Sequence, residues 1–384
     1  MTLAFMRRSL AVAAIAAAAV LASCTTGPSQ AELEAQRMAE AQAAAAAAAA
    51  AVRVAPPISM NSGVAESAAI YVSFLRDVGT IRGGFPDAES IQAAMRKGAA
   101  YDPIQLSQGM IAYASIVALQ SPEFVAGVRQ YGVDPVQRRQ VIENIVYNPA
   151  YAATLPGAEA GAGLIIATLG RDISDMVTIA DAVEQDAYTI QARGDSRRSW
   201  AVAPLPNRAE RLEAIKQISG RRMMPPAEDT ARLYAAANSG SGLSVPGGTS
   251  RPPYTPVIAN ALAMAALAAL GAAGDEARPN TQALMQESGS EFCLSMSKLN
   301  LFQCLAASRP SYEDIFCLGR HITRDLATCT TEATQITTIV VGDPQETGAA
   351  PARTPISVTV PQATPVPTPA VATTQSLNTG PTTR

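Results

Sequence analysis

Residues 158–193, AEAGAGLIIATLGRDISDMVTIADAVEQDAYTIQAR, form the longest periodic stretch of this sequence and indicate its fold class. Apolar residues recur every seven positions in two series that lie three positions apart, which marks one side of a helix. This pattern over four repeats predicts a long helix with coiled-coil-like packing against a long partner. The expected partner is Val64 to Val78 or Leu106 to Leu119 of the same chain, and the alternative is a second copy. The two series are Ile166, Ile173, Ala180 and Ala187, and Leu169, Met176, Val183 and Ile190.

The remaining positions of this helix carry several carboxylates. Because no histidine or cysteine joins them, we expect a solvated acidic face, with metal binding as the less favoured alternative. The carboxylates are those of Asp172, Asp175, Asp181, Glu184 and Asp186.

The surrounding region, residues 64–238, is predicted to be one helical domain. Four prolines in it each follow a residue whose side chain caps helices, as in Asp102-Pro103, Ser121-Pro122, Asp134-Pro135 and Asn148-Pro149. The capping side chain accepts a bond from the open helix end, and the proline lacks only an N–H that would be unpaired there. No run of alternating β-branched residues with hairpin turns interrupts the pattern. The sequence therefore predicts an all-α fold.

A glycine- and proline-rich stretch, SGSGLSVPGGTSRPPYTP at 239–256, is predicted to be a flexible linker. Beyond it, Thr255-Pro256 opens an apolar, alanine-rich helix that extends to about Ala273. This helix is short and weakly hydrophobic for a membrane span, so we expect a buried core helix.

A second helical unit, residues 257–333, contains the four cysteines other than Cys24. Cys293 and Cys304 are 11 residues apart, about three helical turns, and so share one side of a helix. Cys317 and Cys329 are 12 apart, which fits less well. A turn near Pro310 separates the pairs, and we expect Ser311 and Asp314 to cap the following helix.

Two antiparallel helices joined in this way place Cys304 beside Cys317 and Cys293 beside Cys329. An exported chain meets an oxidising compartment, so we expect two nested disulfides that staple a helical hairpin. Zinc binding, with His321 as a further ligand, is the alternative. It is less favoured because zinc ligands usually occur as close Cys-x-x-Cys pairs, which this sequence lacks. Apart from that alternative, His321 is expected to lie on the surface.

Both ends of the chain are predicted to lie outside the packed body. Residues 24–63 form an alanine-rich helical spacer, with Ser29 and Glu32 as a capping box and a helix to about residue 53. Residues 334–384 are rich in threonine and proline and contain no aromatic residue, so we expect a disordered tail.

Residues 1–23 have the order of a secretory signal: Arg7 and Arg8, an apolar run, then small residues. Leu21-Ala22-Ser23-Cys24 resembles the lipobox of bacterial lipoproteins. The resemblance covers the signal alone. It implies that residues 1–23 are removed, that Cys24 receives lipid, and that Cys24 becomes the first residue of the mature chain. Because Thr25 and not aspartate follows Cys24, the resemblance further implies transfer to the outer membrane, facing the periplasm.

Charge and motif content limit the function. Removal of the signal takes two arginines from a chain of formal charge −3, leaving −5, which argues against a nucleic-acid partner. The chain has one histidine and no phosphate-binding loop or nucleophile elbow. We therefore expect no enzyme activity, cofactor or metal, and a structural or protein-interaction role. The partners would be the membrane, through the lipid anchor, and an envelope protein or a second copy.

One enzymatic alternative needs only a glutamate. Glu287-Ser288, in the segment ALMQESG at 283–289, resembles the Glu-Ser pair of peptidoglycan lytic transglycosylases, which are helical and often lipid-anchored. The resemblance implies an envelope enzyme with Glu287 as its acid. The sequence then departs from that family, because the cysteine hairpin follows where a Gly-Leu-Met-Gln type of segment is expected. The preferred interpretation of Glu287 is an exposed residue at a helix end.

Overall fold

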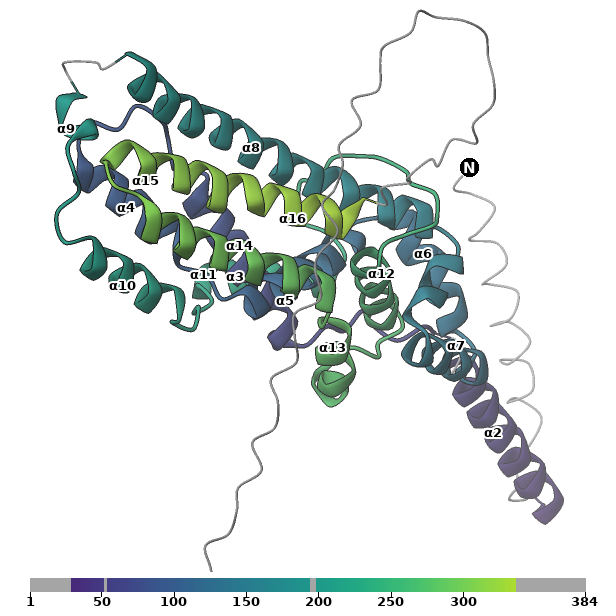
Figure 1. Cartoon of the computed structure of the whole chain (residues 1–384). Helices are drawn as coiled ribbons and strands as arrows, with labels where there is room; N and C mark the ends of the chain where they lie inside the picture. Colours follow the sequence, from purple (N-terminus) through teal and green to yellow (C-terminus); the bar gives the residue numbers. More distant parts are fainter. Residues whose placement is uncertain (1–28, 52–53, 194–197, 336–384) are drawn as a thin grey trace, which may run out of the picture. The chain divides into compact units, whose positions relative to one another are not determined.

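The computed structural model describes residues 29–51, 54–193 and 198–335 (Figure 1). Within these ranges the regular structure is helical. The only strand-like pairings there are two isolated bridges, between Met60 and Ala273 and between Pro204 and Pro310. The predicted all-α class is therefore confirmed. The predicted signal at residues 1–23, Cys24 and the predicted tail from residue 336 lie outside the described residues.

The α-helices, in chain order, are α2 (Gln30–Ala51), α3 (Ser62–Val78), α4 (Ala88–Ala99), α5 (Pro103–Ala118), α6 (Pro122–Arg129), α7 (Pro135–Tyr147), α8 (Ala158–Arg193), α9 (Ser199–Val202), α10 (Arg208–Ser219), α11 (Ala227–Ser239), α12 (Pro256–Ala269), α13 (Arg278–Leu284), α14 (Ser288–Ala307), α15 (Ser311–Leu318) and α16 (Asp325–Thr334). Short 3-10 helices are η1 (Gln130–Gly132), η2 (Pro149–Thr154) and η4 (Asp275–Ala277), and η5 (Gly319–Arg324) is a π-helical turn.

The proline-led helix starts are built as predicted. Asp102, Ser121 and Asp134 each accept a backbone N–H from the first turn of the helix that the next proline begins. Asn148 does the same for η2, and Thr255 for α12. In α2, the capping box is formed by reciprocal bonds between the side chains and backbone N–H groups of Ser29 and Glu32. These bonds satisfy donors that the helix itself leaves open.

Helix α12 forms the centre of the core, because twelve of its fourteen residues are buried. It packs against α5 and η2 and is also in contact with α6, α7, α8, α13 and α16. Its alanines allow neighbouring helices to approach closely on every side. The predicted buried helix is thus confirmed, although it ends at Ala269 instead of near Ala273. Among the described residues, no single helix has both the length and the apolar character of a membrane span. Helix α5 taken together with α6 and η1 is long and apolar enough, but this pair is sharply bent at the break between them.

The apolar stripe of α8 is buried inside the same chain. Leu169, Met176, Val183 and Ile190 are at most 3% exposed. As expected, part of the cover comes from α5, but most comes from α15, η5 and α16, which run beside α8 (Figure 1). The predicted pairing with residues 64–78 is therefore replaced by packing against the cysteine hairpin.

Residues 64–238 and 257–333 do not form separate units, which corrects the predicted domain division. They lie in one compact unit and share one core. The segment 239–256 lies against the body and does not link two domains: Ser250 N–H donates to Glu159 O at 2.9 Å. The backbones meet closely where both sides are glycine, because a Cβ on Gly163 would lie 2.3 Å from the carbonyl group of Gly248.

Candidate functional site

The cysteine hairpin consists of α14 on one arm and α15, η5 and α16 on the other. Cys293 is bonded to Cys329 and Cys304 to Cys317, with Cα–Cα distances of 5.6 and 5.8 Å. This is the nested pairing that the sequence predicts. All four thiols are therefore occupied, and the described residues contain no group of three or more residues suited to hold a metal ion.

The π-helical turn η5 explains how unequal spacings form matched pairs. In a regular helix, 11 residues make about three turns, whereas 12 residues overshoot by about a third of a turn. A π turn accommodates an extra residue without moving the residues beyond it off their face. Because η5 lies between Cys317 and Cys329, the 12-residue spacing on this arm matches the 11-residue spacing on α14.

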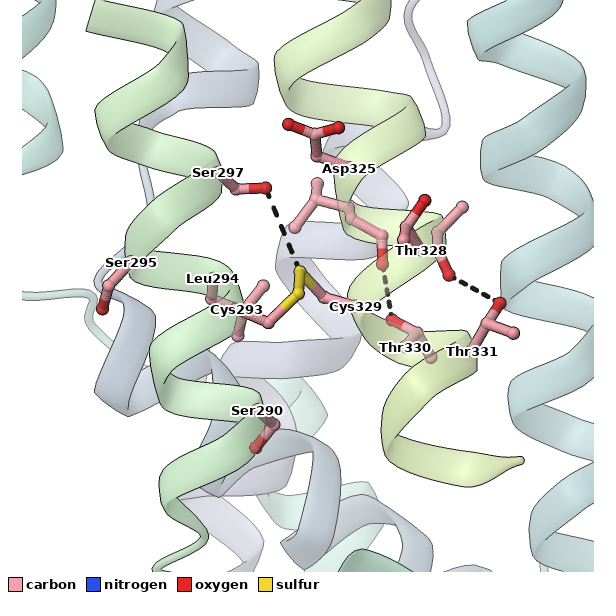
Figure 2. Close-up of a disulfide and its surroundings, with 12 residues drawn as sticks. Ser290, Cys293, Leu294, Ser295, Ser297, Asp325, Thr328, Cys329, Thr330 and Thr331 are labelled. Atoms are coloured by element: carbon pink, nitrogen blue, oxygen red, sulfur yellow. Dashed lines mark hydrogen bonds between the residues drawn. A yellow bond between two sulfur atoms is a disulfide. The ribbon is translucent and has the colours of Figure 1, made fainter. Parts of the chain in front are cut away.

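Figure 2 shows the surroundings of the Cys293–Cys329 disulfide. The Ser297 hydroxyl lies 4.0 Å from Cys329 Sγ. The hydroxyls of Thr330 and Thr331 donate to carbonyls one turn earlier in α16, at 2.8 Å each. Those two hydroxyls are thus engaged within their own helix, which favours a structural role for this end of the hairpin.

A buried carboxylate secures the other end of the hairpin. Asp314 is 1% exposed and accepts bonds from Ser308 Oγ at 2.7 Å, from Gln92 Nε2 at 2.8 Å and from the Arg211 guanidinium. It therefore joins α4 and α10 to the turn beside Cys304–Cys317. The expected capping role is wrong, because α15 begins at Ser311 with Pro310 in the N-cap position and no side-chain cap. The Asp314 carboxylate accepts charge-assisted hydrogen bonds from the three partners named above instead, and these bonds are stronger.

The inner side of α14 carries a buried lysine. Lys298 Nζ donates to the carbonyls of Tyr101 and Ser219, the latter at 2.9 Å, and lies 4.2 Å from the centre of the Tyr101 ring. Burial lowers the pKa of Lys298 to about 8. The ammonium group thereby connects α14 to the ends of α4 and α10. The sequence offered one signal for this role, because Lys298 is the only charged residue between positions 292 and 308.

The acidic residues of α8 are only partly solvated, which corrects the expected acidic face. Arg324 of η5 donates to Glu184 Oε1 at 2.6 Å and to Asp181 Oδ1 at 2.5 Å. Asp186 is 9% exposed, pairs with Arg198 and accepts the N–H of Gly84 at 2.8 Å. These carboxylates therefore fasten α8 to the hairpin and to the loop before α4.

Asp172 of α8 has a different environment. It accepts a bond from the hydroxyl of Tyr71 at 3.2 Å, and burial raises its pKa to about 6. The neighbouring void, which Tyr71, Met176 and Ser290 help to line, has a volume of about 10 Å³. That volume holds one water molecule and is too small for a substrate.

The outer side of α14 is exposed, and the half-buried Glu291 is the one charged residue that borders it. We define the outer stripe as six of its exposed residues, which recur at helical spacing along one face. Phe292 is 68% exposed, Leu299 45% and Met296 38%. Large apolar side chains seldom gather on one face of a soluble helix without a partner. The outer stripe consists of Ser288, Phe292, Ser295, Met296, Leu299 and Gln303.

Other hollows on the surface differ in their lining. One, of about 710 Å³, is an open groove whose lining mixes Glu66, Asp102 and Arg222 with Ile104 and Met224. A smaller hollow of about 240 Å³ is lined by aromatic side chains of α8 and α15, including Tyr188 and Phe316. In the groove, the Ser67 hydroxyl donates to the carbonyl of Gly63 at 2.9 Å and not to a carboxylate that could act as its base.

The remaining sequence-predicted residues have local roles. Glu287 is half-buried and caps α14, accepting the N–H groups of Gly289 at 2.9 Å and Ser290 at 2.6 Å. His321 Nδ1 lies 3.0 Å from Asp325 Oδ2, one turn later, and its side chain is about a fifth exposed. The cysteine hairpin thus contains no arrangement in which His321 joins the cysteines as a metal ligand.

Comparisons with known proteins return no relatives. No protein-family model, no curated protein and no solved structure matches the chain.

Proposed function

We propose that this protein is a non-catalytic lipoprotein of the cell envelope that works by contact with another protein. In this proposal Cys24 carries the lipid, and the body faces the periplasm from the outer membrane. The outer stripe of α14 is the observation that supports contact most directly. It places exposed apolar side chains on a helix whose other side is held by two disulfides and by Lys298. A rigid face on which exposed apolar side chains alternate with uncharged polar ones is suited to protein recognition.

The entry of the chain into the body supports anchoring from the N-terminal side. Arg129 donates to Pro56 O at 2.7 Å, and Ser59 N–H donates to Ala268 O at 3.0 Å. The Asn61 side chain donates to the carbonyl of Ala273 at 2.9 Å. A tether that leads from a lipid to residue 54 would thus be joined to the core by several bonds and not by one loose turn.

Two substitutions test the proposal. Cys24→Ser should abolish incorporation of labelled fatty acid and move the protein out of the membrane fraction. Equal labelling of both forms would contradict the anchor.

Leu299→Glu should abolish capture of partners by cross-linking in intact envelopes while leaving the fold intact. Val136→Lys is the matched control, because Val136 is 70% exposed on α7, away from the outer stripe.

Glu287 lends no support to the enzymatic alternative. A general acid has to reach the bond that it protonates. The Glu287 carboxylate is bound to two N–H groups of its own helix start. Contact therefore remains the function that we propose.

A further inference from the structure

Helices α8 and α15 enclose a hollow of about 240 Å³ whose lining suits a cation. On the basis of the proposed role in protein contact, we infer that this hollow takes the cationic side chain, lysine or arginine, of a partner protein. The site shares no residue with the outer stripe. We call it the aromatic hollow, and it is lined by Ala187, Tyr188, Gln191, Tyr312, Glu313 and Phe316.

The first argument is the gathering of aromatic rings. Aromatic residues make up only 5% of the chain, yet three of them line this one hollow. The ring centres of Tyr188 and Phe316 lie 5.9 Å apart and their planes are inclined by 60°, so the two rings form a corner. Tyr188 remains 48% exposed in this position. Because the face of an aromatic ring attracts positive charge, such a corner contacts a compact cation from two sides.

The second argument is charge complementarity. Among the described residues that line the hollow, Glu313 is the only charged one. Its Oε2 accepts the backbone N–H of Arg309 at 2.6 Å, which fixes the carboxylate but leaves its negative charge, because the donor is neutral. A lysine ammonium or an arginine guanidinium supplies the positive charge and can donate to the other oxygen, Oε1. The side-chain oxygen of Gln191 and the tyrosine hydroxyls are further acceptors.

The third argument is that the hollow is held in shape before a ligand binds. Tyr312, Glu313 and Phe316 are interspersed along α15 with residues that are fixed in the interior. Asp314 is 1% exposed and bound to α4 and α10, and Cys317 belongs to a disulfide. The other wall, α8, packs directly against α15 (Figure 1). A preorganised site binds more tightly because less conformational entropy is lost on binding.

The size of the hollow and its single carboxylate favour a side chain over other ligands. Pockets for drug-sized molecules have volumes of about 300 Å³ or more, so 240 Å³ suits one extended side chain. One carboxylate matches one positive charge, whereas a free diamine would leave its second ammonium unpaired. A sugar ring lies best on a flat aromatic face, and the inclined rings of Tyr188 and Phe316 offer a corner instead.

The test measures binding of small probes to the full lipidated chain in detergent micelles. The tyrosines carry fluorine labels, and the fluorine NMR signals of Tyr188 and Tyr312 are assigned from their phenylalanine variants. Nα-acetyl-lysine amide and Nα-acetyl-arginine amide should each shift these two signals saturably. Nα-acetyl-norleucine amide has an apolar stem like that of lysine but no charge, and it should bind at least about tenfold more weakly.

Two substitutions in the hollow should weaken binding of the lysine amide. Glu313→Gln keeps an oxygen for the Arg309 N–H but removes the charge, so the loss should be at least about fivefold. Tyr188→Leu removes one ring at an exposed position, and the loss should be about two- to fivefold. Tyr234→Leu is the matched control, because Tyr234 is 43% exposed on α11 and lies outside the hollow. The thermal midpoints of all three variants should stay close to that of wild type.

Three results would overturn the inference. Equal binding of the norleucine amide, or undiminished binding to Glu313→Gln, would show an apolar hollow without preference for charge. Saturable binding of N-acetylglucosamine in place of the two cationic probes would show a sugar as the occupant. Signals of Tyr188 and Tyr312 that shift with none of the probes would show that the hollow binds neither class of ligand.

The source of the cation and the proposed function are tested separately. In intact envelopes, Tyr188→Leu and Glu313→Gln should capture fewer partners by cross-linking than Tyr234→Leu does, and equal capture would overturn a partner protein as the source. Leu299→Glu leaves the aromatic hollow unchanged and should bind the lysine amide as wild type does. If Leu299→Glu still captures partners, the outer stripe is contradicted, whereas normal binding of the probes leaves the aromatic hollow supported.

Discussion

Helices α8 and α14 both have apolar residues at helical spacing over a long stretch, yet they use them in opposite ways. In α8 the apolar series is covered by α5 and by the second arm of the cysteine hairpin. In α14 one side is held by disulfides and Lys298, while the outer stripe stays exposed. Periodicity therefore shows that a helix needs a partner, but not whether that partner belongs to the same chain.

The two helices also differ in where their charged side chains lie. The α8 carboxylates pair with Arg198 and Arg324, so its polar side contributes to the fold. The exposed positions of α14 are uncharged, and the one lysine in its middle points inward to carbonyl acceptors. A face that is exposed yet free of charge has no evident role in holding the monomer together. This is why α14, and not α8, carries the proposed interface.

The largest effect should come from placing a charge in each apolar face. Val183→Asp in α8 should destabilise the fold by more than about 4 kcal/mol, because it buries an unpaired carboxylate in a packed interface. Leu299→Asp in α14 should change stability by less than about 0.5 kcal/mol. Urea denaturation of both variants measures the contrast, and similar losses in the two would break the comparison.

Removing a disulfide should cause the next largest loss of stability, and the two disulfides should differ in size of effect. In the chain-entropy account, the loop of separation 36 closed by Cys293–Cys329 contributes about 4 kcal/mol, and the loop of 13 closed by Cys304–Cys317 about 3 kcal/mol. Paired Cys→Ala variants, compared by urea denaturation, test this order. Because both bonds join α14 to the arm that covers α8, either loss should also speed hydrogen exchange in α8. Unchanged exchange would show that the α8 cover does not depend on the hairpin.

These two helices also show what could be predicted from sequence. The cysteine pairing followed from the spacing of Cys293 and Cys304, because helical rotation is regular. The turn η5 was not predictable, since a π turn has no fixed residue signature. The domain boundary at 239–256 was wrong because glycine and proline indicate an irregular backbone, which can also lie packed against a body. Asp314 is bound by Arg211, 103 positions away, and Asp186 by the N–H of Gly84, 102 positions away, and no local pattern reveals such partners.

The outer stripe was missed for a related reason. Helix α14 is apolar on both sides, so its sequence does not distinguish the buried side, with Leu294 and Leu301, from the exposed side. The cysteine spacing places one side of α14 against the second arm, but it does not show whether another element covers the opposite side. The Glu-Ser pair at its start was visible, but its capping role needed the geometry of Gly289 and Ser290.

A smaller effect should appear at Asp172 of α8 as the pH changes. Its folded pKa of about 6 exceeds the ordinary value of 3.8, so the folded state keeps a proton that the unfolded state releases. The contribution of Asp172 to stability is therefore fully present below about pH 4 and is lost as the pH rises to about 6. Asp172→Asn should be more stable than wild type by about 1–2 kcal/mol at pH 7.5, and nearly equal to it at pH 4. A difference that does not vary with pH would contradict this assignment.

The smallest effect on stability should come from Glu287→Gln at the start of α14, and it separates the two functions most sharply. Gly289 and Ser290 donate to different oxygens of the Glu287 carboxylate, and the glutamine keeps only one of them. It also loses the charge that faces the helix N-terminus, so the loss should be about 0.5–1 kcal/mol. If the protein works by contact, this variant should replace wild type fully in cells, whereas Leu299→Glu should not. If the protein cleaves peptidoglycan, the order reverses: Glu287→Gln is inactive while folded, and Leu299→Glu retains activity. Purified wild type that digests peptidoglycan, together with an inert Glu287→Gln, would therefore replace contact with catalysis as the function of the hairpin.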